Sequence, residues 1–149
     1  MNGLRGAVAS VLLVAALSGC AGSGSKNENQ GGGGGCTPPD VPTISYANNI
    51  QPIYDTSCAL AGCHLGAAPA FGLNLAAGVS YDATVSVKSI QRPKLFLVDP
   101  GNPDDSYLVR KIEGGPDIAG DMMPANMPPL PADEMDAIRQ WITECAPNN

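Results

Sequence analysis

The sequence predicts an all-α domain made of about three to five short helices joined by long irregular loops. Three observations lead to this fold class. Apolar residues recur at helical spacing in separate stretches, most clearly in 132–145. The chain contains 18 glycines and 14 prolines, which indicate that much of it is loop. Only 5% of the residues are aromatic, so a large flat apolar cofactor would complete an otherwise thin aliphatic core.

The first 19 residues are predicted to be a lipoprotein signal peptide. Arg5 precedes an apolar run of 11 residues over 7–17, which is too short to span a bilayer as a helix. The run leads into Leu17-Ser18-Gly19-Cys20, which resembles a bacterial lipobox and implies cleavage before Cys20 and acylation of that residue. Residue 21 is Ala rather than Asp, and by resemblance to other lipoproteins this favours an outer-membrane anchor, with the domain facing the periplasm or the cell surface. The alternative is an ordinary signal peptide with an incidental cysteine.

Residues 20–35 are predicted to form a flexible, lipid-anchored Gly/Ser linker, because they contain almost no apolar side chains. A folded domain is therefore expected over 36–149.

The first half of that domain is expected to contain two short helices. Apolar side chains at helical spacing predict a helix over 49–57, with Asn48 or Asn49 as its cap. Pro52 fits its first turn, where a missing N–H is no loss. The stretch 76–87 is ambiguous, and the more favoured interpretation is a short helix near 81–85.

The second half is predicted to contain a helix over 106–113 and a longer one over 132–145, stopped by Pro147. Gly114 and the residues after it are expected to end the first of these helices. Between the two helices, 118–131 carries prolines at four positions, so it is expected to be stiff, extended and irregular. Such a loop can hold a side chain at a fixed position. The apolar stripe of the last helix consists of Met135, Ile138, Ile142 and Cys145, with Trp141 beside it.

The stretch Cys58-Ala59-Leu60-Ala61-Gly62-Cys63-His64 carries two of the five cysteines and the only histidine. Two thiols next to an imidazole are the pattern that binds a c-type haem: both thiols bond to the porphyrin and the imidazole ligates the iron. The usual spacing leaves two residues between the cysteines, whereas here there are four. Two alternatives remain open: a small disulfide loop between Cys58 and Cys63, or a zinc site completed by Cys36 or Cys145.

A second axial ligand of such an iron would come from elsewhere in the chain. Because His64 is the only histidine, bis-histidine ligation within one chain is impossible. Methionine, or a rarer ligand such as lysine, would be needed. Three methionines lie in the proline-rich stretch: Met122, Met123 and Met127.

Several short motifs occur in the order found in small mono-haem, class I-like cytochrome c domains, and together they resemble most closely those of bacterial lipoproteins and planctomycete-type cytochromes. The match covers roughly residues 44–147. The matching segments are Pro52-Ile53, Cys58 to His64, Gly72-Leu73-Asn74-Leu75, Pro100 to Leu108, Met123-Pro124 and Trp141-Ile142.

The resemblance implies a small helical domain folded around one covalent haem c. It implies thioether bonds from Cys58 and Cys63, His64 as one axial ligand, and Met123 as the other, with Met127 as the alternative and Met122 third. Cys145 stands where these domains usually have Gly before Ala-Pro.

A disulfide between Cys36 and Cys145 is also predicted. With Cys20 assigned to lipid and Cys58 and Cys63 to haem, these two cysteines remain, at the two ends of the folded domain. An even remainder in an exported protein indicates a disulfide, the alternative being two unpaired thiols.

The predicted function is one-electron transfer between Fe(III) and Fe(II) by a lipid-anchored haem protein whose partners are other redox proteins. The formal charge of -6 and the lack of a basic run argue against binding to nucleic acid. An enzyme is not expected, because the single histidine is already assigned and no second one can act as acid or base. The alternative function is that of a non-redox, disulfide-stapled structural or binding lipoprotein.

Overall fold

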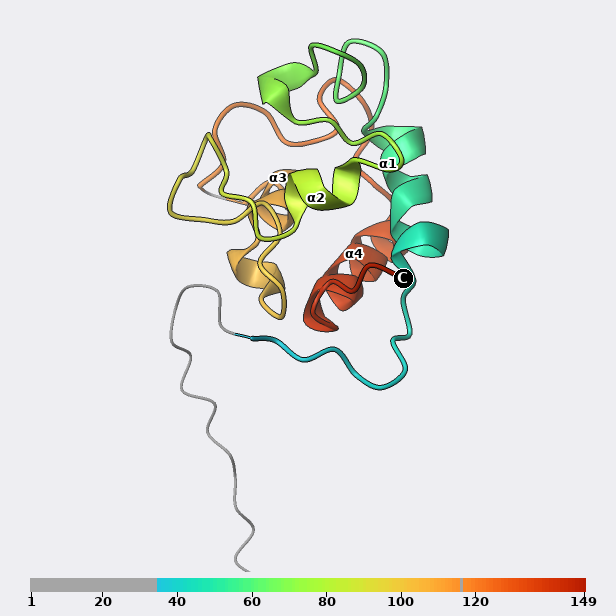
Figure 1. Ribbon diagram of the computed structural model, residues 1–149. Helices are drawn as coiled ribbons and strands as arrows, with labels where there is room; N and C mark the ends of the chain where they lie inside the picture. The colour runs from blue at the N-terminus through green and yellow to red at the C-terminus, as the bar shows by residue number, and fades with distance from the viewer. Residues whose placement is uncertain (1–34, 116) are drawn as a thin grey trace, which may run out of the picture. The chain divides into compact units, whose positions relative to one another are not determined.

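The computed structural model describes residues 35–115 and 117–149 as a set of short helices joined by long loops (Figure 1). The helices are α1 (Gln51–Ser57), α2 (Ser80–Thr84), α3 (Tyr107–Glu113) and α4 (Ala132–Thr143), with single turns η1 (Tyr46–Ile50), η2 (Ala70–Gly72) and η3 (Pro103–Asp105). Within the described residues, β-pairing is limited to three isolated bridges. The expected helical class is confirmed.

The predicted signal peptide 1–19, the acylated Cys20 and all but the last residue of the linker 20–35 lie outside the described residues. In the part that is described, every helix is too short or too polar to cross a bilayer.

The first helical segment begins earlier than the sequence indicated. It opens with the π-turn η1 and continues as α1, so the prediction of a start at residue 49 is wrong. The cap is Ser45, whose hydroxyl accepts the Asn48 N–H at 3.2 Å, while Asn49 accepts the Ser45 N–H at 2.9 Å. The π-turn shifts the hydrogen bonds ahead of Pro52, whose ring would clash with the i−4 carbonyl of a regular α-helix.

The middle of the chain follows the predictions closely. α2 and α3 lie within one residue of their expected positions. α3 ends at Gly114, whose φ of 72° is a left-handed conformation that favours glycine. The described residues from 117 to 131 contain neither helix nor strand, as expected.

The last helix ends two residues before the predicted limit. α4 stops at Thr143, and Cys145 and Ala146 both adopt positive φ, 70° and 48°. The Ala146 N–H donates to the Trp141 carbonyl at 2.8 Å and closes the helix end. This left-handed exit turns the chain away from the helix axis before Pro147 is reached.

The core lies where η1 packs on α4. The rings of Tyr46 and Trp141 have centroids 5.3 Å apart, and Trp141 is fully buried. The chain end returns to the same place, because the Ala47 N–H donates to the Asn149 carbonyl at 2.9 Å (Figure 1). The two ends of the domain therefore pack together through η1 and α4, with Tyr46 and Trp141 in the core.

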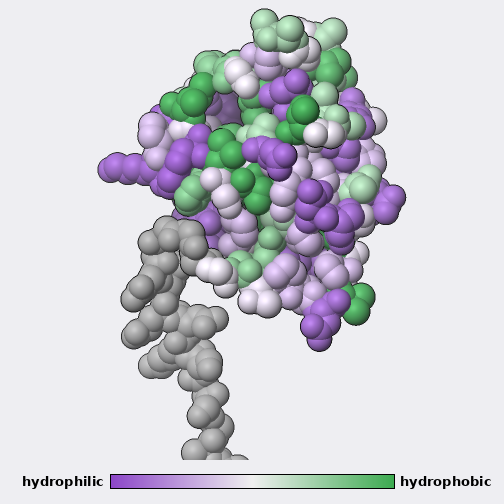
Figure 2. All heavy atoms as spheres, in the orientation of Figure 1, coloured by the Kyte–Doolittle hydropathy of each residue, from purple (hydrophilic) through white to green (hydrophobic). Residues whose placement is uncertain are grey.

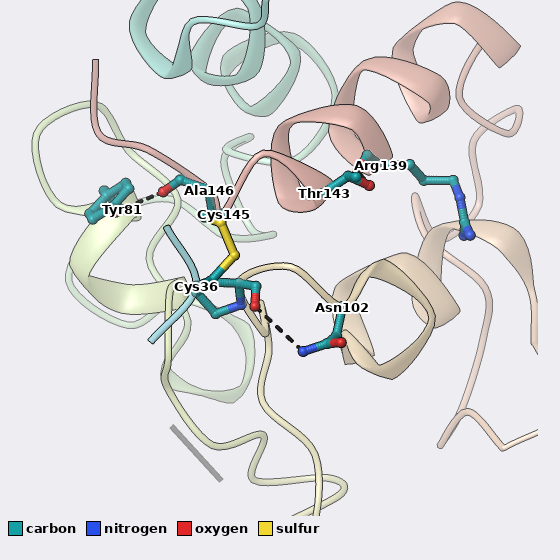
Figure 3. Close-up of a disulfide and its surroundings, with 8 residues drawn as sticks. Cys36, Tyr81, Asn102, Arg139, Thr143, Cys145 and Ala146 are labelled. Atoms are coloured by element: carbon teal, nitrogen blue, oxygen red, sulfur yellow. Dashed lines mark hydrogen bonds between the residues drawn. A yellow bond between two sulfur atoms is a disulfide. The ribbon is translucent and has the colours of Figure 1, made fainter. Parts of the chain in front are cut away.

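Cys36 and Cys145 form the predicted disulfide, with Cα atoms 5.5 Å apart (Figure 3). Gly101 permits this approach, since a Cβ there would lie 2.8 Å from the Cys36 sulfur. Beside the bond, the Tyr81 hydroxyl donates to the Ala146 carbonyl at 2.8 Å. The disulfide therefore joins the start of the domain to the left-handed turn after α4.

A second, non-covalent link lies next to the disulfide. The buried carboxylate of Glu144 accepts hydrogen bonds from the Thr43 N–H at 3.0 Å, the Ile44 N–H at 3.2 Å and the Gln140 side chain at 2.9 Å. The Thr43 hydroxyl donates to it as well. Although burial by itself raises the pKa of Glu144, these hydrogen bonds together hold that pKa below its usual value.

Between α2 and α3, the chain folds back on itself in an irregular arm that was not foreseen. The Ser86 N–H donates to the Val98 carbonyl and the Leu97 N–H to the Val87 carbonyl, at 2.9 and 2.7 Å. This arm supplies one wall of the cavity described next.

Candidate functional site

A cavity of about 400 Å³ brings together most of the residues to which the sequence assigned a function. Cys58, Cys63 and His64 line it from the loop after α1, and Met123 and Met127 line it from the loop before α4. Its size lies within the range of small-molecule and cofactor sites, about 300 to 1,000 Å³. Residues predicted from separate motifs thus line one cavity.

The loop that carries the two cysteines is closed by its own backbone. The Cys63 N–H donates to the Leu60 carbonyl at 2.9 Å, and the His64 N–H to the Cys58 carbonyl at 3.2 Å. Gly62 has a φ of 81° between these bonds, a conformation that other residues rarely adopt. The four intervening residues are therefore folded into a compact turn that directs Cys58, Cys63 and His64 toward the cavity.

The imidazole of His64 is oriented by a backbone carbonyl. Its Nδ1 lies 3.1 Å from the Leu73 carbonyl oxygen, which can only accept a hydrogen bond, so Nδ1 carries the proton. The lone pair then resides on Nε2, the other ring nitrogen. A histidine held in this way has the tautomer that metal-binding histidines use.

Cys58 and Cys63 are both free thiols, so the alternative of a disulfide loop between them is not formed in the structure. Burial, with smaller contributions from the nearby Glu134 and Cys63, raises the pKa of the Cys58 thiol to about 11.

The alternative of a zinc site lacks the further cysteine that would complete it. It required Cys36 or Cys145, and both of these are used in the disulfide. Among the described residues, no group of three or more histidine, cysteine or acidic side chains is placed to hold a metal ion.

The structure separates the three methionines. Met123 is half-buried, packs against the core and lines the cavity. Met127 also lines the cavity but is 42% exposed. Met122 does not line it, because its sulfur packs on the end of α3, 2.9 Å from where a Cβ on Gly114 would lie.

The charge of the cavity wall is one-sided. Lys88 and Lys111 line it, and no acidic residue of the described part of the chain does so. Lys88 stacks over the Phe96 ring at 3.5 Å and donates to the Lys94 carbonyl. Lys111 is buried, and this burial lowers its pKa against the opposing effect of Asp121. In a domain with an acidic excess, this wall suits a ligand that is largely apolar and carries carboxylates.

The cavity opens to solvent past exposed apolar side chains. Phe71 and Ile90 line it and are 64% and 69% exposed. Hydrophobic residues are prominent over the upper part of the molecule in Figure 2, where the loop containing η2 lies in Figure 1.

Sequence reasoning missed three residues of the site. Leu73 belongs to a recognised motif, but its role is that of a carbonyl acceptor, which no side-chain pattern reveals. Tyr107 was predicted only as part of the helix over 106–113, yet it also lines the cavity. Lys111 lies in the same helix. Its burial was not expected, because lysine side chains are usually exposed.

Comparison of the chain with protein-family models, with curated proteins and with solved structures finds no match in any of the three.

Proposed function

We propose that this protein binds one haem c covalently and carries single electrons between redox partner proteins. The observation that carries the proposal is the shared cavity: a Cys/Cys/His loop and a methionine-bearing loop line the same apolar space.

The residues present fit a haem on three counts. The thiols of Cys58 and Cys63 are free, as thioether formation requires. His64 donates through Nδ1 and keeps Nε2 for an axial bond. Lys88, in the wall of the cavity, has the charge that would attract a propionate group.

In this proposal Cys58 and Cys63 would hold the group, each adding its sulfur and its hydrogen across one vinyl double bond. His64 and Met123 would be the axial ligands. The haem would supply the one-electron Fe(III)/Fe(II) couple, and histidine–methionine ligation raises its potential. The chain itself would contribute ligand orientation, exclusion of water by the apolar wall, and an exposed apolar edge for a partner.

One further feature agrees with the family resemblance. Cys145, which replaces the usual glycine, has a φ of 70°, so the backbone there has the conformation that glycine favours.

The interpretation as a doubly disulfide-stapled binding protein required a Cys58–Cys63 bond that the structure does not contain. The lipobox and the outer-membrane anchor remain part of the proposal on sequence grounds.

The test is haem staining of a denaturing gel, together with the intact mass, for protein exported in a host that attaches c-type haem. Wild type should stain and gain the mass of one haem. Cys58→Ala and Cys63→Ala should each leave at most one thioether, and the double variant should not stain. An unstained wild type of unchanged mass would refute the proposal.

A further inference from the structure

The loop that carries Met123 has no helix or strand to hold it, yet its backbone is tied at several points to one helix. The Met123 N–H donates to the Lys111 carbonyl at 2.7 Å. The ammonium group of the same lysine donates to the Ala119 carbonyl at 2.9 Å and to the Asp121 carbonyl. One residue of α3 therefore contacts the segment 119–123 at three places.

A second residue on the same face of α3 holds the start of this segment. The Tyr107 hydroxyl accepts the Ala119 N–H at 2.9 Å and donates to Gln91 at 3.1 Å. Tyr107 and Lys111 are four residues apart, so they are neighbours on the helix surface. Both are buried and both line the cavity.

The charge of Lys111 is balanced in an unusual way. The ion pairs among the described residues are formed by Arg110 and Arg139, and Lys111 takes part in none of them. Its ammonium is instead stabilised by hydrogen bonds to backbone carbonyls of the methionine loop. Hydrogen bonds from a charged donor are about twice as strong as neutral ones, and burying a lysine without them is costly.

We infer that Lys111, assisted by Tyr107, is the positioning residue that holds Met123 at the cavity wall. This inference rests on the proposed function and adds how the methionine ligand is kept in place. α3 is itself anchored, because its Leu108 N–H donates to the Leu97 carbonyl at 2.9 Å. These contacts of Lys111 and Tyr107, here called the clamp, thus connect the methionine loop to a helix that is itself bonded to the neighbouring arm.

The test replaces Lys111 with methionine in the haem-loaded protein. Lys111→Met keeps the apolar stem of the side chain and removes the ammonium group, leaving the Ala119 and Asp121 carbonyls without that donor. Met123 should then leave the iron more often, so added imidazole should bind the ferric protein more tightly. Loss of charge-assisted hydrogen bonds predicts an increase in imidazole affinity of at least about tenfold. Amide hydrogen exchange in the peptide 117–124 should accelerate in parallel.

Two control variants separate positioning from general effects. Lys94→Met removes an exposed positive charge that does not line the cavity and should leave both readouts at the wild-type value. Glu144→Gln destabilises the far end of the domain and should leave imidazole affinity unchanged. The inference would be overturned if either control raised the imidazole affinity as much as Lys111→Met does. It would also be overturned if Lys111→Met had the imidazole affinity and the amide exchange of wild type.

If Lys111→Met does not fold, Tyr107→Phe decides the question, because it removes only the hydroxyl that holds Ala119. An increase of a few-fold in imidazole affinity is expected from the loss of these neutral hydrogen bonds, and no change would overturn the clamp. A wild-type protein without haem would refute the proposed function instead. The exchange measurement would still report on the clamp in that case.

Discussion

Removal of the Cys36–Cys145 disulfide should destabilise the domain strongly without disturbing the cavity. The bond joins residues 109 apart in sequence. The loop-entropy relation for about 110 residues gives about 4.8 kcal/mol at 25 °C, near the upper end of the usual loss of about 2 to 5 kcal/mol.

The expected change in melting temperature follows from the size of the domain. For about 115 residues, the entropy of unfolding is about 0.24 kcal/mol/K near 60 °C. The melting temperature of Cys36→Ser or Cys145→Ser should therefore fall by about 20 °C for the full loop-entropy value, and by about 8 °C for a loss of 2 kcal/mol.

Three readouts check this reasoning in haem-loaded protein. Circular dichroism melts should show the fall, and the double variant should match each single one because both changes remove the same bond. The haem spectrum should survive, since neither cysteine lines the cavity. Additive losses in the double variant, or free thiols at both positions in non-reduced peptide maps of the exported protein, would refute the argument.

Three further predictions concern the far end of the domain, the membrane and the iron. The pKa of Glu144 is lower in the folded protein than its usual 4.5. The contribution of Glu144 to the free energy of unfolding is therefore complete above pH 4.5 and is lost as the pH falls through the pKa of the folded state. The free energy of unfolding of Glu144→Gln should be about 1 to 3 kcal/mol below that of wild type at pH 7, and the difference should be smaller at pH 3. Urea unfolding at both pH values measures this difference. Cys20→Ser should move the protein from the membrane fraction to the soluble fraction, and unchanged membrane association would disprove acylation. Met123→Ala should lower the reduction potential and abolish the absorption band of methionine bound to ferric iron, whereas Met127→Ala should preserve both; the opposite result would reassign the ligand.

Local sequence signals predicted the helices of the second half well. The spacing of Ile138 and Ile142 indicated α4, and both side chains are buried. Gly114 ends α3 through its left-handed conformation, a property of that residue alone. The earlier start at Tyr46 was missed because Pro52 was expected in the first turn of a helix. The π-turn before it lets the helical segment begin several residues earlier.

The irregular arm over 85–98 could not be predicted from its own residues. Its order depends on pairs such as Val85 with Val98 and Phe96 with Ser106, which are bridges between separate parts of the chain. No periodic pattern marks such a segment, since isolated bridges impose no alternation over several residues.

The chemical types at the site were determined by the sequence alone: two thiols, one imidazole and three methionines in a proline-rich loop. A motif of two cysteines and one histidine within seven residues is visible without a fold, because its members are neighbours in the chain. The disulfide partners were likewise found by counting cysteines, and their Cα distance of 5.5 Å confirms the pairing.

Only the tertiary structure decided which methionines line the cavity and what holds Met123 there. Met122 and Met123 are adjacent in sequence, but one packs on Gly114 and the other has its N–H bonded to Lys111. The tautomer of His64 depends in the same way on a carbonyl nine residues further along the chain. These choices rest on backbone partners whose direction is set by packing. A backbone carbonyl is present at every residue, so the sequence carries no mark of the one that will be used.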